Sequence, residues 1–114
     1  MFRFLSSIFG NNKPANTAIK VIDAKTFKKA ISNKKVQLVD VRTANEYNAG
    51  AIKNAKNIDI FSNKFILNVN KLDKENPVYV YCRSGGRSKR ASKKLAVLGF
   101  KEIYNLKGGI LNYN

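Results

Sequence analysis

The sequence has no histidine, no tryptophan and a single cysteine among its 114 residues. Without histidine, catalytic schemes that need a histidine base are excluded. One cysteine cannot build a zinc or iron–sulfur site of the usual kinds, so we expect neither a metal nor a cofactor. It also cannot close an internal disulfide, which argues against a disulfide-stapled secreted protein and leads us to expect a cytoplasmic protein.

Acidic residues are also scarce: there are 7, against 22 Lys and Arg, which gives a formal net charge of +15. Such a charge attracts anions in general, including small oxyanions, nucleic acid and anionic membranes. The lysines are spread along the whole chain, and no motif that reads RNA or DNA accompanies them. We therefore expect a small anionic ligand and no specific nucleic acid partner.

The first nine residues, MFRFLSSIF, are mostly apolar but too short to span a bilayer. Phe2, Leu5 and Phe9 share one helical face, so weak contact of residues 1–9 with a membrane surface, or export, stays open as an alternative. Residues 10–17 (GNNKPANT) are typical of a linker. We therefore assign residues 1–17 to an N-terminal extension and residues 18–114 to one compact domain.

Beyond the linker, strand-like and helix-like patterns alternate. Branched and aromatic runs predict strands at residues 19–22, 36–41, 58–61, 78–81 and 103–106. Helical spacing of apolar residues predicts helices at residues 24–32, 43–50, 65–72 and 86–98. This alternation predicts an α/β fold with a small, mostly parallel sheet of about five strands and helices on both faces, in three layers.

Two of these helices have ends with recognisable caps. Thr43 and Glu46 fit a capping box, in which the threonine accepts from the third helical amide and the glutamate reaches back, and capping is the simplest role for Glu46. Gly99 stands where a left-handed C-terminal cap is expected, with Phe100 able to fold back onto the helix.

The most informative segment is residues 78–95, in which a buried strand ends at Cys82, a glycine loop follows and a helix begins. In open α/β sheets, ligands bind beyond the carboxyl ends of the strands. Gly85 and Gly86 allow positive φ values and turn their amides inward, which makes an anion-binding nest at the positive end of the helix. A cysteine in that field should have a depressed pKa and act as a nucleophile without a separate base.

The side chains of the same loop suit an anionic substrate. Arg83 and Arg87 add fixed positive charge and fork-shaped donors. Ser84 and Ser88 supply hydroxyl donors, and Lys89 adds to the attraction of an anion toward the loop. We therefore take Cys82 as the catalytic residue and assign substrate binding to the rest of the loop, namely Arg83, Ser84, Gly85, Gly86, Arg87 and Ser88.

Three segments together resemble the signatures of the rhodanese family. They are VDVR at residues 39–42, with Glu46-Tyr47 and Ala51-Ile52 after it, CRSGGRS at residues 82–88, and GGI at residues 108–110. The resemblance extends from about Ile19 to Tyr113. It implies a rhodanese-like domain, in which Gly50-Ala51 replaces a Gly-His pair found in many members and Tyr113 replaces a common tryptophan.

The resemblance implies a two-step sulfur transfer. The Cys82 thiolate takes a sulfur atom from a donor such as thiosulfate, the loop amides stabilise the resulting persulfide, and an acceptor such as cyanide or a cellular thiol removes it. A sulfur-relay protein is a further expected partner. Asp40 and Arg42 are expected to support the site by pairing with each other or with neighbours, rather than by touching the substrate.

Two other functions stay open. The first is a sulfur carrier or partner-binding module that holds a persulfide without turning over thiosulfate. The second is a phosphatase or arsenate-reductase-like enzyme. The loop length argues against the second, because four residues separate Cys82 from Arg87, whereas the phosphatases of this fold have five. A smaller ring of amides suits one sulfur atom better than a phosphoryl group.

Overall fold

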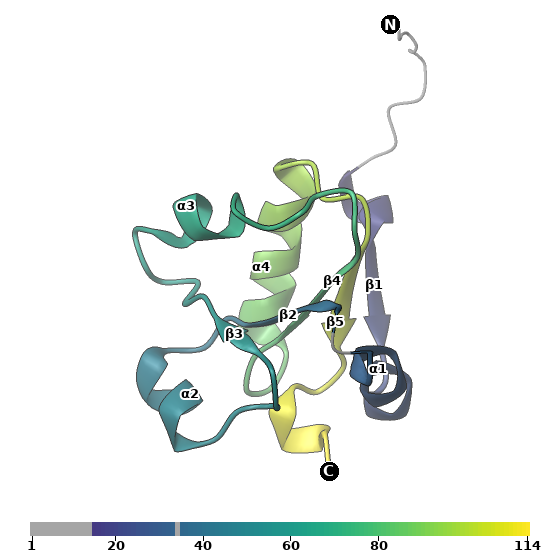
Figure 1. Cartoon of the computed structure of the whole chain (residues 1–114), viewed down its shortest axis with the longest axis vertical. Helices are drawn as coiled ribbons and strands as arrows, with labels where there is room; N and C mark the ends of the chain where they lie inside the picture. The colour runs from purple at the N-terminus through teal and green to yellow at the C-terminus, as the bar shows by residue number, and fades with distance from the viewer. Residues whose placement is uncertain (1–14, 34) are drawn as a thin grey trace, which may run out of the picture.

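The computed structural model describes residues 15–33 and 35–114 (Figure 1), so the predicted N-terminal extension lies largely outside the described residues. The strands are β1 (Ile19–Ile22), β2 (Gln37–Asp40), β3 (Lys56–Asn57), β4 (Val78–Tyr81) and β5 (Ile103–Leu106). The helices are α1 (Ala24–Ile31), α2 (Ala44–Ala49), α3 (Phe65–Val69) and α4 (Gly86–Val97). Two short 3-10 helices, η1 (Ala15–Ala18) and η2 (Ile110–Asn112), complete the chain.

The five strands form one parallel sheet in the order β1-β5-β4-β2-β3. Strand β4 lies at its centre, with Val80 in register with Val39 of β2 on one side and Asn105 of β5 on the other. Because all strands run the same way, their carboxyl ends meet at one edge of the sheet. The residue that follows β4 therefore stands at the middle of that edge.

Helices cover both faces of the sheet, which confirms the predicted three layers (Figure 1). The alternation of β4 divides its side chains between two buried clusters. Val78 and Val80 pack against α4 and α3, whereas Tyr81 packs with Phe27 of α1. The core on each face of the sheet is thus largely apolar, with Asn105 of β5 as a buried polar exception.

The predicted caps are present. Thr43 and Glu46 form the complete capping box at the start of α2. Gly99 has φ +100° at the end of α4, and the Phe100 amide donates to the Leu95 carbonyl at 3.1 Å, which closes the helix as expected. Phe100 itself is buried against this end of the core.

The predicted strand at residues 58–61 is wrong. The strand in this region is β3, two residues earlier, and the chain then turns because the Asp59 carboxylate accepts from the Phe61 amide at 2.9 Å. Ile58 and Ile60 are nevertheless buried, and their amides donate to the carbonyls that end β2. The alternation of apolar residues therefore reflects the burial of Ile58 and Ile60 in an extended loop that follows β3. The predicted helix at 65–72 also ends early, at Val69.

Within the described residues, no helix is long and apolar enough to cross a membrane.

Candidate active site

The turn between β4 and α4 holds Cys82 at the centre of the carboxyl edge. Cys82 is the residue after β4, is 1% exposed, and belongs to the core cluster shared by β4 and α4. Gly85 adopts φ +116°, a left-handed conformation that side-chain-bearing residues rarely take, and this turns its amide back toward the cysteine. The Gly85 amide donates to Sγ of Cys82 at 3.1 Å. The buried sulfur therefore accepts a hydrogen bond from an amide of the loop.

The Ser88 side chain is the second polar contact of the sulfur. In the thiol form Sγ of Cys82 donates to Oγ of Ser88 at 3.4 Å, and that hydroxyl donates to the Gly85 carbonyl at 3.1 Å. Burial of Cys82 opposes ionisation, but hydrogen bonds from the Ser88 hydroxyl and from the amides of Ser88, Gly85 and Ser84 lower the pKa of the thiol overall. These hydrogen bonds thus reduce the cost of a negative charge on the sulfur in a position that is otherwise apolar.

The C-terminal segment holds the outer side of this loop. The Ile110 amide donates to the Cys82 carbonyl at 2.9 Å, and the Leu111 amide donates to the Arg83 carbonyl at 3.2 Å. Gly109 packs directly on this backbone, where a Cβ atom would collide with the Arg83 carbonyl. Because the Cys82 and Arg83 carbonyls are hydrogen-bonded to the C-terminal segment, they point away from the sulfur, and the loop amides are free to point toward it.

Arg87, which the sequence assigns to substrate binding, forms an ion pair with Glu46. Its guanidinium donates two hydrogen bonds to Glu46, at 2.7 and 2.9 Å. The pKa of Glu46 falls from 4.5 to about 2, chiefly because of these bonds and despite partial burial. Glu46 therefore both caps α2 and binds the first turn of α4. Sequence reasoning missed this contact, since 41 residues separate the partners and neither local pattern points to the other.

Asp40 and Arg42 form a buried pair at the end of β2. The Asp40 carboxylate accepts from the Arg42 backbone amide at 2.9 Å and from its guanidinium at 2.7 to 3.1 Å. Arg42 also donates to the Gly50 carbonyl at 2.7 Å, and its guanidinium lies over the ring of Tyr81 at 5.6 Å from the centroid. The pair thus fixes the turn after β2 and the end of α2 relative to the strand that precedes Cys82.

The remaining loop residues lie at the surface. Arg83, Ser84 and Gly86 are exposed, and so is Lys89 on the first turns of α4. In residues 15–33 and 35–114, neither Arg83 nor Lys89 makes an ion pair. Their charges are therefore available to an anion that approaches the loop. The same residues contain no group of three potential metal ligands among His, Cys, Asp and Glu.

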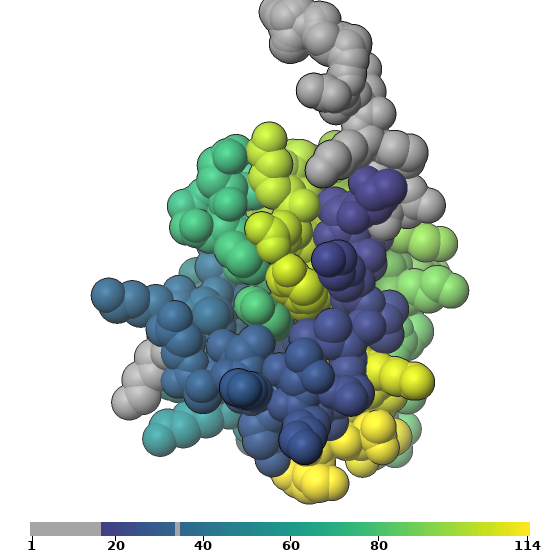
Figure 2. Space-filling model, turned by 90° about the vertical axis from the view of Figure 1, so that its right-hand side faces the viewer, coloured from purple at the N-terminus to yellow at the C-terminus, as the bar shows by residue number. Residues whose placement is uncertain are grey.

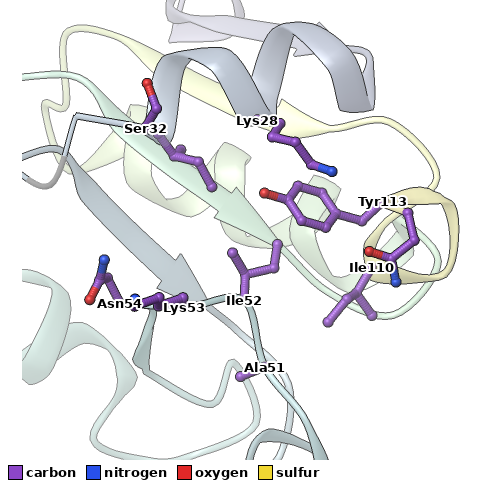
Figure 3. Close-up of a pocket in the computed structure, with 10 residues that line it drawn as sticks. Lys28, Ser32, Ala51, Ile52, Lys53, Asn54, Ile110 and Tyr113 are labelled. Atoms are coloured by element: carbon purple, nitrogen blue, oxygen red, sulfur yellow. The ribbon is translucent and has the colours of Figure 1, made fainter.

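A groove of about 460 Å³ lies beside the site, on the α1 face of the carboxyl edge. Figure 3 shows Tyr113 pointing into it beneath Lys28, with Ile52 and Ile110 below the ring. Nζ of Lys28 lies 4.8 Å from the ring centroid of Tyr113. Cys82 does not line this groove, but Ile110 connects the two through its bond to the Cys82 carbonyl.

Comparison with known proteins gives one family. The sequence matches the family model described as rhodanese-like domain over residues 23–114. Among solved structures, a rhodanese-like domain protein from Staphylococcus aureus is similar with a TM-score of 0.73 and 33% identity, over 83% of this chain and 91% of that one. A polysulfide-sulfur transferase from Wolinella succinogenes is similar with a TM-score of 0.66 and 32% identity, over 87% of this chain and 75% of that one.

Curated relatives include longer proteins. A tRNA uridine(34) hydroxylase from Pelagibacter ubique is 40% identical over 94% of this chain. The uncharacterized protein YqhL from Bacillus subtilis is 47% identical over 67% of this chain. The chain spans 35% and 59% of the lengths of these two relatives, respectively.

The Ser88 hydroxyl should lower the pKa of the Cys82 thiol. In Ser88→Ala, the thiolate loses the hydroxyl that stabilises it, so the pKa of Cys82 should rise above that of the wild type. Titration of the ultraviolet absorbance of the thiolate measures this directly and needs no reagent to reach the sulfur. Ser92→Ala is the matched control, because Ser92 is equally buried one turn later but bonds to the Ser88 carbonyl instead of the sulfur. Identical titrations of Ser88→Ala and the wild type would contradict this role.

The Glu46–Arg87 pair should make stability depend on pH in a defined window. Because the pKa of Glu46 is depressed in the fold, its contribution is complete above about pH 4.5 and is lost as the pH falls toward about 2. Glu46→Gln keeps a capping side chain but loses the charge. The melting temperature of the wild type should exceed that of the variant at neutral pH, and the difference should shrink between pH 4.5 and 2. A constant difference across that window would refute the assignment.

Proposed function

The chain belongs to the rhodanese-like family, and from that premise we propose that it is a sulfurtransferase that carries sulfur as a persulfide on Cys82. The observation that supports this most directly is the pair of polar contacts of Sγ, which accepts from the Gly85 amide at 3.1 Å and lies 3.4 Å from Oγ of Ser88. These groups stabilise negative charge on a sulfur atom before any substrate arrives.

In the first step, the Cys82 thiolate attacks the sulfane sulfur of thiosulfate. A new S–S bond forms to Sγ, the S–S bond of thiosulfate breaks, and sulfite leaves with the electron pair. Cys82 is 1% exposed, so a donor must present a narrow terminal atom to the sulfur. The sulfane sulfur of thiosulfate is such an atom, and so is the end of a polysulfide chain, the substrate class named for the Wolinella relative.

In the second step, the acceptor attacks the outer sulfur of the persulfide. With cyanide, a C–S bond forms, the S–S bond to Cys82 breaks, and thiocyanate leaves while the thiolate is restored. A cellular thiolate reacts in the same way and becomes the new persulfide. The loop amides stabilise the charge on Sγ in the thiolate and on the outer sulfur in the persulfide, so neither step needs a histidine base.

The electrostatics of the loop favour a small dianionic donor. Arg83 and Lys89 are exposed and make no ion pair in the described part of the chain, so they attract the donor. Arg87 has its charge offset by Glu46 and instead holds the loop against α2. The return of the persulfide to a thiolate by cellular thiols suits a reducing compartment, so we propose that the protein acts in the cytoplasm.

Thiosulfate loading tests the proposal. After incubation with thiosulfate, the intact mass of the wild type should increase by one sulfur atom, and Cys82→Ser should show no gain. Thiocyanate production with cyanide should fall by about ten-thousandfold or more in Cys82→Ser, because the nucleophile is lost. Equal melting temperatures of the two proteins establish that the fold is retained.

The alternative roles give different results in the same assays. A persulfide with negligible thiocyanate production indicates a carrier that receives sulfur from, or passes it to, a relay protein. Hydrolysis of an aryl phosphate that depends on Cys82 indicates phosphatase chemistry. The proposal fails if neither thiosulfate nor polysulfide adds sulfur to Cys82.

A second candidate substrate is tRNA. It is favoured by the 40% identity to a tRNA uridine(34) hydroxylase and by the net charge of +15. The chain spans 35% of that relative, so we propose tRNA binding and not the relative's whole reaction. The chain should bind tRNA more tightly than DNA duplex of equal charge in a gel-shift assay at 200 mM salt. Equal affinities, with a steep loss between 50 and 200 mM salt, would indicate only nonspecific attraction to phosphates.

A further inference from the structure

The sheet has an open edge at β1. This strand comes first in the order β1-β5-β4-β2-β3, so in the described part of the chain it pairs with a strand on one side alone. Figure 1 shows β1 at the right-hand border of the sheet, and Figure 2 looks onto that border, where β1 lies at the surface in purple. An edge strand presents N–H and C=O groups to any strand that can lie beside it.

The backbone of Val21 points to this open side. The Ile22 carbonyl accepts from the Lys107 amide at 2.8 Å, and Ile22 is in register with Leu106 of β5. Successive residues of a strand direct their backbone groups to opposite sides, so Val21 directs its N–H and C=O away from β5. A further strand can therefore pair with Val21 without replacing a bond between β1 and β5.

Neither face of β1 is covered at its middle. Lys20 and Val21 point to opposite faces of the sheet, and both are exposed, Val21 by 59%. On the α4 face, Ile19 and Val21 form one wall of a groove of about 330 Å³ that also borders α4 and the residues after β5. An extended segment beside β1 therefore places every second side chain in this groove.

The charge around the groove has one sign. Lys89 and Lys93 of α4 and Lys107 after β5 line it, and all three are exposed. None of them makes an ion pair in the described part of the chain. The Asp23 carboxylate interacts with Lys107 through charge, but it caps α1 by accepting from the Thr26 amide at 2.8 Å. One carboxylate against three ammonium groups leaves the groove positive.

These features together select the kind of occupant. A second copy of this chain would bring its own Lys20 and a net charge of +15 to the edge, and lysine on an edge strand opposes such pairing. A nucleic acid has the opposite charge but no peptide N–H and C=O for Val21. An extended peptide with acidic side chains has both the charge and the backbone groups.

We propose that the β1 edge binds an extended acidic segment of a partner protein, which adds a strand to the sheet. Its main chain pairs with Val21, and an apolar side chain packs on Ile19 and Val21 in the groove. The carboxylates that flank this side chain lie among Lys89, Lys93 and Lys107.

The groove extends to the loop that follows Cys82. Gly85 lines the groove, and its amide donates to Sγ of Cys82 at 3.1 Å. A partner held at β1 therefore lies beside the loop at which a relay protein would exchange sulfur. Pairing with β1 does not use the thiol, so Cys82→Ser should bind the segment like the wild type. Failure of the sulfur-transfer proposal would leave this one standing.

The experiment is an NMR titration of the labelled full chain with the blocked peptide acetyl-Glu-Thr-Val-Thr-Glu-amide at about 150 mM salt. This peptide places valine between two glutamates on one face of a strand. Amide shifts should change at Val21, Lys89 and Lys93, and the Val21 amide should exchange more slowly with solvent. In Val21→Pro, affinity should fall at least about tenfold, because proline removes the outward N–H and no bond to β5.

Two N-methylated peptides separate strand pairing from attraction by charge. Methylation of the valine amide blocks one side of the peptide backbone, and methylation of both threonine amides blocks the other. With the wild-type chain, one of these peptides should lose at least about tenfold in affinity, and the other should bind like the parent. A loss at valine indicates an antiparallel partner strand, and a loss at the threonines indicates a parallel one. Equal binding of all three peptides would overturn the proposal.

Matched lysine variants test the charges without altering β1. Lys93→Gln should weaken binding about threefold. Lys94→Gln should not, because Lys94 is the next exposed lysine of α4 but does not line the groove. The proposal is overturned if the shifts map outside β1 and α4, or if folded Val21→Pro binds the peptide as well as the wild type does. Dimerisation of the wild type that Val21→Pro abolishes would assign the edge to a second copy instead. Displacement of the peptide by RNA, with equal RNA affinity in Val21→Pro and wild type and no N-methyl effect, would assign the groove to nucleic acid.

Discussion

The site depends on one interaction, the hydrogen bond from the Gly85 amide to Sγ of Cys82. The sulfur is buried at the end of the central strand, where a charge would be strongly disfavoured without donors. The left-handed conformation of Gly85 makes the interaction available, since it turns the peptide at the start of α4 toward the sulfur. The parallel sheet places Cys82 at its carboxyl edge, and the conformation of Gly85 provides the amide that stabilises negative charge on the sulfur.

The rest of the chain holds that loop from three directions. On one side, Gly109 and Ile110 pack against and bond to its backbone. On another, Glu46 binds Arg87 in the first turn of α4. Below it, the buried Asp40–Arg42 pair fixes the end of β2 beside the strand that carries Cys82. These contacts come from segments far apart in the sequence, and preorganisation of an anion site requires such support because the donors must already be in place.

Features encoded by residues close together in the sequence could be predicted, whereas contacts between distant segments could not. The turn at Cys82, the capping box of Thr43 and the cap at Gly99 are encoded within a few residues, and the structure has all three. The strand predicted at residues 58–61 is wrong because the alternation of Ile58 and Ile60 with polar residues is typical of a strand. Their amides donate to carbonyls at the end of β2, but they do not form a strand ladder. The pairing of Arg87 with Glu46 could not be predicted, because the two residues are close only after the sheet has formed.

The Glu46–Arg87 pair also bears on how the site selects an anion. If Arg87 were free, a fixed guanidinium beside the loop would favour any oxyanion that could accept its fork of donors, phosphate included. With Arg87 bound to Glu46, the donors left at the sulfur are short-range amides and the Ser88 hydroxyl, which bond to one atom. The long-range attraction falls to Arg83 and Lys89 at the surface, which concentrate anions without distinguishing them. Under the proposed function, selection for a terminal sulfur atom would come from the few amides at the buried Cys82, and the surface charge would contribute rate rather than specificity.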